Sequence, residues 1–447
     1  MRKTYRAIRI AVAIGSGAAF CLWAAKQEKA LSLGTPFAFL SLALFSGALI
    51  SALFRLATLA GTDGDPLSSD TRAQRLKAWA ALIGFGMAVS LVQYMLVFLL
   101  ARPGTGFLAA FDHLYYRSDV AHYMGIARDW YAKEGDARLR LVFLPLYPLS
   151  ARLFTWGENY YRGAFLAAQI FSLLCLPAGY ELFRQDVDRS AAMACARLLF
   201  LLPGCAFLRV PMSESLFLLL TLLAVCFCRK KLYLPAALFA ALSALTRSLG
   251  ILILVLLGVE MLYDFALTWR QDHRRALSKL PGFAACLLLG CGGTLAYLAI
   301  NRSVSGSAFT FLTYQRENWN QRMGLFFNTA AYQAQYAQYY LEQGKISSFL
   351  SLSVPNILCC FGTLGLLYAH RDRMRVSYLI WALVYFAAAV GATWLLSGPR
   401  YLGMLFVLAF PLKRLGNTAT KEGILEGILL LLQTGYLLML ALDMSVY

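Results

Sequence analysis

Runs of apolar residues long enough to cross a lipid bilayer recur along this chain of 447 residues. A membrane-spanning helix needs about 20 such residues, whereas the strands of a membrane β-barrel are about half as long and alternate in polarity. Only 14% of the residues are charged, compared with about a quarter in soluble domains, and 60% are hydrophobic. The sequence therefore predicts an all-α, polytopic helical membrane protein.

We expect about thirteen transmembrane helices from the length and spacing of these runs. They lie near residues 10–25, 36–60, 79–101, 163–183, 190–209, 212–228, 232–245, 248–265, 281–300, 348–369, 376–396, 400–412 and 423–445. The runs at 232–245 and 400–412 are short, which indicates tilted or broken helices. Three regions follow: two extra N-terminal spans and a linker in 1–78, a transmembrane module in 79–412, and a last span in 413–447.

Lysine and arginine are concentrated in the short loops, and in membrane proteins such loops face the cytoplasm. These residues are Arg2, Lys3, Arg72, Arg75, Lys77, Arg184, Arg189, Arg229, Lys230, Lys231, Arg270, Arg274, Arg275, Arg371, Arg373, Arg375, Lys413 and Arg414. The longer polar loops, 102–162 and 301–347, then lie on the outer face of a cell membrane or, alternatively, of the endoplasmic reticulum. The net charge of +18 mostly reflects these loops, so it does not indicate nucleic-acid binding.

Cysteine and glycine usage argues for packing inside the membrane. Most of the ten cysteines lie in apolar runs and the two long outer loops contain none, so we expect no disulfide framework. The segment Gly290-Cys-Gly-Gly293 lies within a predicted span, where small residues allow helices to approach closely.

The first outer loop is the most polar part of the chain between apolar runs. It contains Ser118-Asp119-Val-Ala-His122-Tyr123 and, further on, Phe143-Leu-Pro145-Leu-Tyr147-Pro148. A protein built to live in lipid gains little stability from such a loop. We therefore expect the loop to hold chemistry.

Other polar groups fall at the outward ends of distant spans and so reach the same face. An arginine or aspartate inside a span costs about 2.5–3.5 kcal/mol on insertion scales, so such residues usually face a cavity or a partner. Two acids and several arginines on one face suit a hydroxyl nucleophile and an anionic leaving group. The residues are Asp119, Glu214, Arg247, Gln315, Arg316, Trp319 and Arg400.

Each of these residues also has a purely structural interpretation. Asp119 alternatively caps a helix over 120–132, whose apolar stripe suits a membrane surface. Glu214 alternatively caps its own span, where the helix dipole favours negative charge. Arg247 and Arg400 alternatively extend their charges to the membrane interface. His122 lies one helical turn from Asp119, with which it can pair.

Five short motifs, in order, resemble the membrane mannosyltransferases that add the second mannose of glycosylphosphatidylinositol anchors, and their bacterial relatives. This family belongs to the C-type glycosyltransferase superfamily, and the similarity covers about residues 79–412. The motifs are Arg117-Ser118-Asp119-Val-Ala-His122-Tyr123-Met-Gly-Ile126-Ala127, Phe143-Leu144-Pro145-Leu146-Tyr147-Pro148, Ser213-Glu214-Ser215-Leu216-Phe217, Thr246-Arg247-Ser248 and Pro399-Arg400-Tyr401. Ser118 stands where the family usually has tryptophan, and Leu144 replaces an aromatic residue.

The resemblance implies the C-type glycosyltransferase fold, with amphipathic interface helices in its large first outer loop. It also implies an inverting transfer of a sugar, with mannose expected, from a polyprenyl-phosphate donor. Asp119 would then be the general base, with Asp112, Asp129 and Asp136 as competing candidates in the same loop. Glu214 would orient the acceptor or assist the base, and Arg247 or Arg400 would stabilise the leaving phosphate.

The expected partners are the lipid-linked sugar, membrane lipids, and a lipid, glycan or protein acceptor. No cofactor is expected, because the sugar arrives already linked to lipid phosphate, and the spacing of Asp119, His122 and Glu214 is not a metal signature. The expected substrate-binding residues are Arg117, His122, Tyr123, Pro145, Tyr147, Arg247, Gln315, Trp319, Arg400 and Tyr401.

Two other functions remain open. A transporter or flippase for lipid-linked sugars would also place ionisable residues in the membrane, although it would favour matched broken helices at mid-membrane. An inactive assembly partner is consistent with the departures at Ser118 and Leu144, whereas retention of Asp119, Glu214 and Arg400 argues against it.

Overall fold

The computed structural model describes residues 2–27, 32–60, 70–101, 106, 116, 119–392, 397–442, 444 and 446. Over these ranges the secondary structure is helical apart from one isolated bridge between Met323 and Ala392. The structure thus confirms the predicted all-α architecture.

The helices occur in the following order. The first third of the chain forms α1 (Arg2–Ala24), α2 (Gly34–Ala57), α3 (Arg72–Ala101), α5 (Asp119–Asp129), η1 (Asp136–Val142), α6 (Leu146–Leu153) and α7 (Tyr160–Phe183). The middle forms α8 (Arg189–Leu201), η2 (Pro203–Arg209), α9 (Glu214–Arg229), α10 (Tyr233–Thr246), η3 (Ser248–Leu252), α11 (Ile253–Gln271) and α12 (His273–Ser305). The remainder forms α13 (Thr310–Trp319), α14 (Phe326–Glu342), α15 (Ile346–Ser348), η4 (Phe349–Ser353), α16 (Val354–His370), α17 (Val376–Gly391), α18 (Gly398–Leu402), η5 (Phe406–Leu408), α19 (Ala409–Leu415) and α20 (Ala419–Ala441).

Eight helical segments in the described ranges are long and apolar enough to cross a membrane, or nine if the bent pair α8–η2 counts as one span. The chain is therefore a multi-pass membrane protein, with fewer full-length helices than the thirteen expected. Helices α9, α10 and α17 are shorter than a full span. The predicted span at 400–412 is divided among α18, η5 and α19.

A proline explains the break that follows α8. Helix α8 ends at Leu201, and Leu202 is extended (ψ 138°) before Pro203, where a bend of 78° begins. A residue that precedes proline is biased away from helical backbone angles, so a helix usually ends there. Pro399 occupies the first turn of the short helix α18. These breaks bring non-helical backbone and the polar ends of helices into the body of the protein.

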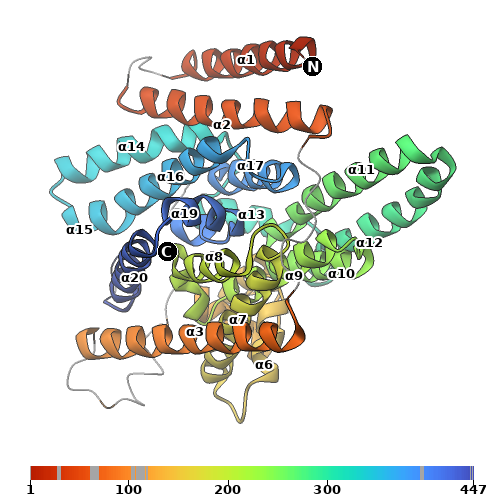
Figure 1. Ribbon diagram of the computed structural model, residues 1–447. Coiled ribbons are helices and arrows are strands. Elements are labelled where there is room, and N and C mark those ends of the chain that lie inside the picture. The colour runs from red at the N-terminus through yellow and green to blue at the C-terminus, as the bar shows by residue number, and fades with distance from the viewer. Residues whose placement is uncertain are drawn as a thin grey trace.

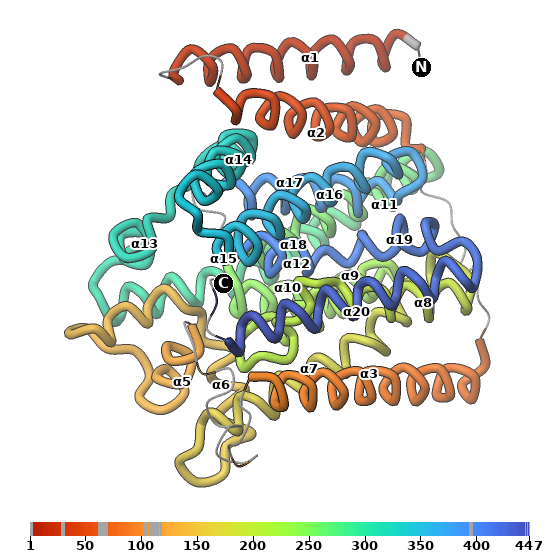
Figure 2. Tube along the Cα trace, turned by 90° about the vertical axis from the view of Figure 1, so that its left-hand side faces the viewer, coloured from red at the N-terminus to blue at the C-terminus, as the bar shows by residue number. Residues whose placement is uncertain are grey.

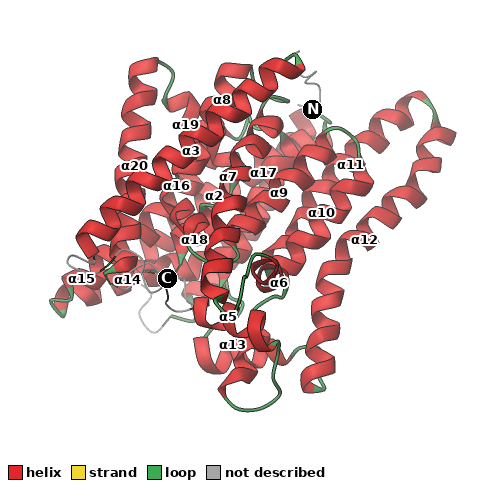
Figure 3. Cartoon of the chain, turned by 90° about the horizontal axis from the view of Figure 1, so that it is seen from below, coloured by secondary structure: helices red, strands yellow, loops and turns green. Residues whose placement is uncertain are grey.

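Most long helices run side by side, and α5, α6 and α13 gather at one end of the bundle (Figure 3). We call this the site end. Helices α1 and α2 form one edge of the molecule (Figures 1 and 2), and the α11–α12 pair projects from the side of the bundle (Figures 1 and 3). The main core lies between these elements, where Trp381 stacks on Phe406 with ring centroids 5.1 Å apart.

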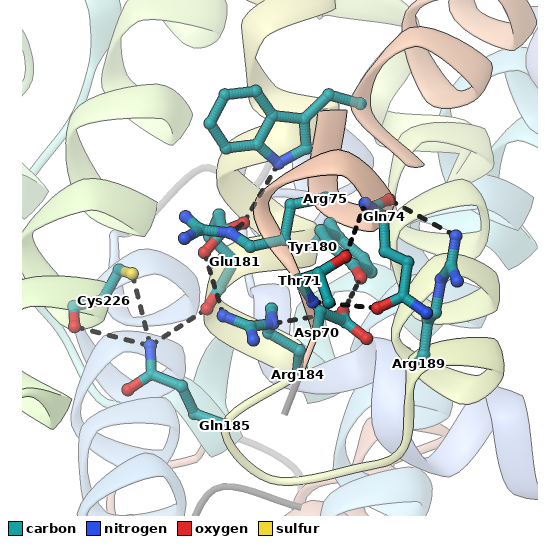
Figure 4. A network of polar contacts seen from close by, with 11 residues as sticks. Asp70, Thr71, Gln74, Arg75, Tyr180, Glu181, Arg184, Gln185, Arg189 and Cys226 are labelled. Carbon is teal, nitrogen blue, oxygen red and sulfur yellow. Dashed lines mark hydrogen bonds and ion pairs between the residues drawn. The ribbon is translucent and has the colours of Figure 1, made fainter. Parts of the chain in front are cut away.

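A polar network fixes the start of α3 against α7 and α8 (Figure 4). The Glu181 carboxylate accepts hydrogen bonds from Arg75 at 2.9 Å and from the Trp79 indole at 3.1 Å, and Arg184 lies 3.3 Å from it. Asp70 accepts a hydrogen bond from Tyr180. Because the far end of α3 leads into the first outer loop, this network marks the opposite end of the bundle, which we call the basal end.

The first outer loop is folded mainly by aromatic packing. The apolar stripe of α5 includes Tyr123, Ile126 and Ala127, and all three are buried in the protein. The expectation that this stripe lies on a membrane surface is therefore wrong for α5. Its partners are the neighbouring aromatic residues of the same loop, including Phe143 and Tyr147, which form a second core under the site.

Candidate active site

A cavity of about 220 Å³ opens at the site end, where five segments distant in sequence meet. Its walls come from α5, from the Val142–Leu144 segment, from the turn after α10, from α13 and its following residues, and from α18. The lining residues are Asp119, Tyr123, Val142, Phe143, Leu144, Thr246, Arg247, Ser248, Leu249, Gln315, Trp319, Gln321, Ser397, Arg400 and Tyr401. Seven of the residues selected from sequence are thus brought to one place.

Four charged side chains form a continuous ion-pair cluster along this cavity. Arg400 donates from Nη1 to Asp119 Oδ2 at 2.6 Å and from Nε to Glu214 Oε1. Arg247 donates from Nη1 to the same Glu214 oxygen. The two arginines are therefore neutralised by two carboxylates, one at the cavity wall and one behind it.

Local backbone geometry directs these groups toward one another. Helix α9 begins at Glu214, where the helix dipole favours negative charge. Helix α10 ends at Thr246, and Arg247 adopts extended angles (φ −147°, ψ 144°) before the next helical turn. Helix α18 is only five residues long and holds Arg400 within it. Each charge thus lies at a helix end or in a short helix.

The cluster differs from a surface ion pair because its charged side chains are largely buried. Glu214 is 0% exposed and Arg400 is 5% exposed. Removing a charge from water is costly unless the charge is paired and hydrogen-bonded. Both arginines contact carboxylates, so the alternative that they extend to the membrane interface is wrong.

Aromatic rings and hydroxyls hold the two guanidinium groups from behind. Arg247 lies over the Tyr401 ring at 5.1 Å, and Arg400 lies over Phe207 at 5.4 Å. Ser213 Oγ accepts a bond from Arg247 at 3.2 Å and lies 2.8 Å from the Tyr123 hydroxyl. These contacts fix the arginines before any substrate enters.

A second group of aromatic residues shapes the opposite wall. His122 stacks on Phe143 with centroids 4.7 Å apart and planes 15° apart, and Trp319 meets both rings edge-on at 5.9 Å. His122 supports the wall and does not itself line the cavity. Such flat apolar surfaces beside polar groups suit a ligand with both C–H faces and hydroxyls.

The protonation state of the first loop follows from these neighbours. Burial alone would raise the pKa of the Asp119 carboxyl, but the Arg400 guanidinium, helped by Arg247, holds that pKa below its usual value. Burial lowers the pKa of the His122 imidazole despite the nearby Asp119 charge. Asp119 is therefore ionised and His122 neutral at pH 7.

Several predicted residues do not reach the cavity. Tyr147 is fully buried, and its hydroxyl donates to the Ala164 carbonyl at 2.8 Å. Pro145 is buried at the start of α6. Both residues lie behind the cavity wall, because the turn that contains them packs inward. Arg117 lies outside the described residues.

The structure also separates the competing acids. Asp129 pairs at the surface with Arg128 and Arg140, and Asp136 begins η1 in an exposed position. Neither residue lines the cavity. Asp112 falls outside the described ranges. Of the described acids in the first outer loop, Asp119 alone lines the cavity.

Gln321 and Leu249 line the cavity without having been selected from sequence. Gln321 follows α13, and its backbone N–H donates to the Gln315 carbonyl at 3.1 Å. The left-handed Asn320 (φ 51°) turns the chain at this point. No sequence pattern distinguishes such a glutamine from the other polar residues of the loop.

No known protein-family pattern matches the chain, and no curated protein matches it. Among solved structures, the chain is similar to ArnT from Cupriavidus metallidurans, crystallised with undecaprenyl phosphate. The sequence identity is 18% and the TM-score is 0.46. The similarity covers 76% of this chain and 62% of ArnT, so it spans less than two thirds of that protein.

Proposed function

We propose that the protein is a membrane glycosyltransferase that moves a sugar from a polyprenyl-phosphate donor to a hydroxyl acceptor. The proposed sugar is mannose. The observation that carries the proposal is the meeting of Asp119 with Arg400 and Arg247 in one cavity of a multi-pass membrane protein. This pairing of one carboxylate with two fixed cations suits a reaction that needs a base on one side and an anionic leaving group on the other.

Asp119 is the general base in this proposal. The acceptor oxygen attacks the anomeric carbon as its proton passes to the Asp119 carboxylate. The bond from the anomeric carbon to the phosphate oxygen breaks, and the polyprenyl phosphate leaves with the electron pair. Because attack and departure occur on opposite faces, a single displacement inverts the anomeric centre. The depressed pKa of Asp119 supports this role, since the group is ionised before the acceptor arrives.

Arg400 and Arg247 hold the phosphate. The ion pair between Arg400 and Asp119, at 2.6 Å, is then the arrangement without substrate. A donor phosphate would compete with Asp119 for Arg400. Transfer of Arg400 from the carboxylate to the phosphate would raise the pKa of Asp119 and strengthen it as a base when the donor is in place. Charge-assisted bonds from guanidinium to phosphate are among the stronger hydrogen bonds in proteins.

Glu214 is a positioning residue in this scheme. It was expected to orient the acceptor or assist the base, but its carboxylate is fully buried and one oxygen is shared by the two arginines. This geometry favours a role in aiming Arg247 and Arg400 at the phosphate. The sugar itself is proposed to lie against Trp319 and Tyr401, with the Gln315 amide as a hydrogen-bonding partner.

The C-type glycosyltransferase assignment and the relation to the second-mannose enzymes come from the sequence motifs. We further propose that the site end faces outward from the cell membrane, with the arginine-rich basal end in the cytoplasm; the endoplasmic reticulum is the alternative. The proposed acceptor is a lipid, glycan or protein. No cofactor or metal takes part in the proposed reaction.

An assay with the purified protein in liposomes distinguishes a transferase from a transporter. Radiolabelled polyprenyl-phosphate-mannose is supplied with a membrane extract as the source of acceptor. A transferase produces a new labelled compound and unlabelled polyprenyl phosphate, whereas a flippase changes only the leaflet in which the intact donor is found. Movement of intact donor across the liposome without any new product would overturn the proposal.

A further inference from the structure

A second, larger cavity lies at the basal end, far from the proposed active site. Its volume is about 500 Å³, within the range of small-ligand sites. It lies where α16 ends and α17 begins, whereas the other end of α17 leads toward Ser397 and Arg400. The 16 residues of α17 separate the two cavities by about 24 Å. We call it the basal pocket.

The basal pocket is lined by more cations than anions. Its charged lining residues are Arg55, Asp186, Asp372, Arg373, Arg375, Lys413 and Arg414. Both carboxylates are already engaged. Asp186 accepts from Arg229 at 2.6 Å and from the Tyr378 hydroxyl at 2.8 Å. Asp372 accepts from Ser51 at 2.7 Å and lies 3.7 Å from Arg371.

Two of the lining cations are likewise neutralised by acids outside the pocket. Arg375 forms a bidentate pair with Glu260 at 2.5 and 2.8 Å, and Lys413 lies 2.8 Å from Glu422. Elsewhere at this end, Arg75 and Arg184 pair with Glu181 (Figure 4). Pairing with a carboxylate is thus common for the basal arginines whose side chains are partly buried.

Three lining arginines have no carboxylate within ion-pair distance among the described residues. Arg55 instead donates to the backbone carbonyls of Arg371 and Met374, at 2.6 Å each, which fixes its guanidinium in place. Arg373 and Arg414 are exposed at the pocket. Burial and the charge of Arg373 lower the pKa of Arg414, as expected for two like charges held near each other.

We propose that the basal pocket binds a phosphate group, carried either by an anionic membrane lipid or by a soluble phosphate compound. An anion in the pocket would relieve the repulsion between Arg373 and Arg414. It would also accept hydrogen bonds from guanidinium groups, which commonly bind phosphate in proteins. Apolar side chains, including Val187 and Phe410, complete the lining, and the pocket lies at the ends of spanning helices. Basic pockets between helix ends on the cytoplasmic side of membrane proteins hold lipid head groups in this way.

The test uses the full-length protein in detergent, with thermal unfolding as the readout. Phosphatidylglycerol is the lipid probe, phosphatidylcholine is the neutral-lipid control, and pyrophosphate is the soluble probe. The double variant Arg373→Gln/Arg414→Gln removes the two exposed lining arginines for which the described part of the chain provides no carboxylate partner. Arg274→Gln/Arg275→Gln is the matched control, because it removes the same charge from an exposed position at the start of α12, outside the pocket.

We expect phosphatidylglycerol or pyrophosphate to raise the midpoint of unfolding of the wild-type protein in a saturable way. The apparent affinity should fall by about one to two orders of magnitude in the pocket variant and stay unchanged in the control. A response to the lipid alone identifies a lipid site, and a response to pyrophosphate identifies a soluble ligand. No response to either probe, or an equal loss in both double variants, would overturn the proposal.

Discussion

At the scale of single residues, the site depends on the Glu214 carboxylate, which forms ion pairs with two arginines. Glu214 lies out of contact with solvent between Arg247 and Arg400, and Asp119 provides the second negative charge. The resting cluster is therefore balanced in charge. A donor phosphodiester adds one negative charge, and the group best placed to take up a proton in response is Asp119.

Glu214→Gln should destabilise the fold, because it leaves two buried guanidinium groups with one carboxylate. Loss of one partner from a buried ion pair costs about 3–5 kcal/mol. Denaturant unfolding in detergent measures the loss. Glu158→Gln, an exposed acid at the same end of the molecule, is the control and should change stability by less than about 0.5 kcal/mol. Equal stability of the two variants would contradict the role assigned to Glu214.

The pH dependence of kcat/KM for transfer, which reports on the free protein, should be flat between about pH 5.5 and 8, as far as the first outer loop determines it. Arg400 depresses the pKa of Asp119, so this carboxylate stays ionised as the pH falls through that window. Its contribution to stability is present above the unfolded-state pKa of about 3.9 and is lost only as the pH falls through the lower folded-state pKa. Burial keeps His122 neutral over most of the window. A loss of kcat/KM near pH 6.5 that disappears in His122→Gln would contradict this assignment.

At the scale of helices, close backbone contacts set the position of Arg400. A Cβ on Gly204 of η2 would lie 1.6 Å from the carbonyl oxygen of Pro399, one residue before Arg400. Only glycine allows η2 and α18 to approach this closely. A comparable contact joins Gly293 of α12 to the Ala241 carbonyl, where a Cβ would lie 1.8 Å away.

Gly204→Ala should therefore displace α18 and move Arg400 away from Asp119. We expect transfer to fall by at least about tenfold, since misplacement of a group by about 1 Å can cost a hundredfold in rate, together with a lower unfolding midpoint. Gly258→Ala is the control, because a Cβ there meets nothing within 4 Å and alanine favours the helix. Similar activity in the two variants would indicate that α18 tolerates the shift.

The sequence predicts some parts of the site and of the fold correctly and others not. The motif residues Asp119, Arg247 and Arg400 meet in one cavity, in agreement with their predicted placement on one face of the molecule. Gly290 and Gly293 also pack closely against neighbouring helices, as small residues within a span suggest, whereas Gly292 has open space beside it. Pro145 and Tyr147 were assigned to the substrate, but a motif does not distinguish a residue in the wall from one behind it. The break near Leu202 follows from Pro203, whereas the division of 400–412 into three short helices depends on packing against neighbouring helices, which a hydropathy pattern does not contain.

At the scale of the whole molecule, the two ends of the bundle differ in charge, and each contains one of the proposed sites. The proposed catalytic cavity occupies one end, and the basal pocket and most arginine-rich loops occupy the other. The positive-inside rule then predicts that the site end faces away from the cytoplasm. A donor with a lipid tail would reach the cavity from within the membrane, and the acceptor would reach it from outside.

Cysteine labelling should reveal this orientation. Ser307→Cys lies in an exposed turn between α12 and α13, and Arg274→Cys lies at the other end of α12. Each is made in a Cys21→Ser background, because Cys21 is exposed. A membrane-impermeant maleimide should label the first variant in intact cells and the second only after permeabilisation. The reverse pattern would place the proposed site in the cytoplasm.

The central claim is that Asp119 is the base and Arg400 holds the donor, and separate measurements of donor binding and sugar transfer test it most directly. Asp119→Asn should bind polyprenyl-phosphate-mannose at least as tightly as the wild type and lose transfer by about two to four orders of magnitude. Arg400→Gln should lose binding as well. Asp129→Asn, a surface acid of the same helix, should retain both. Full transfer by a folded Asp119→Asn protein would contradict the account.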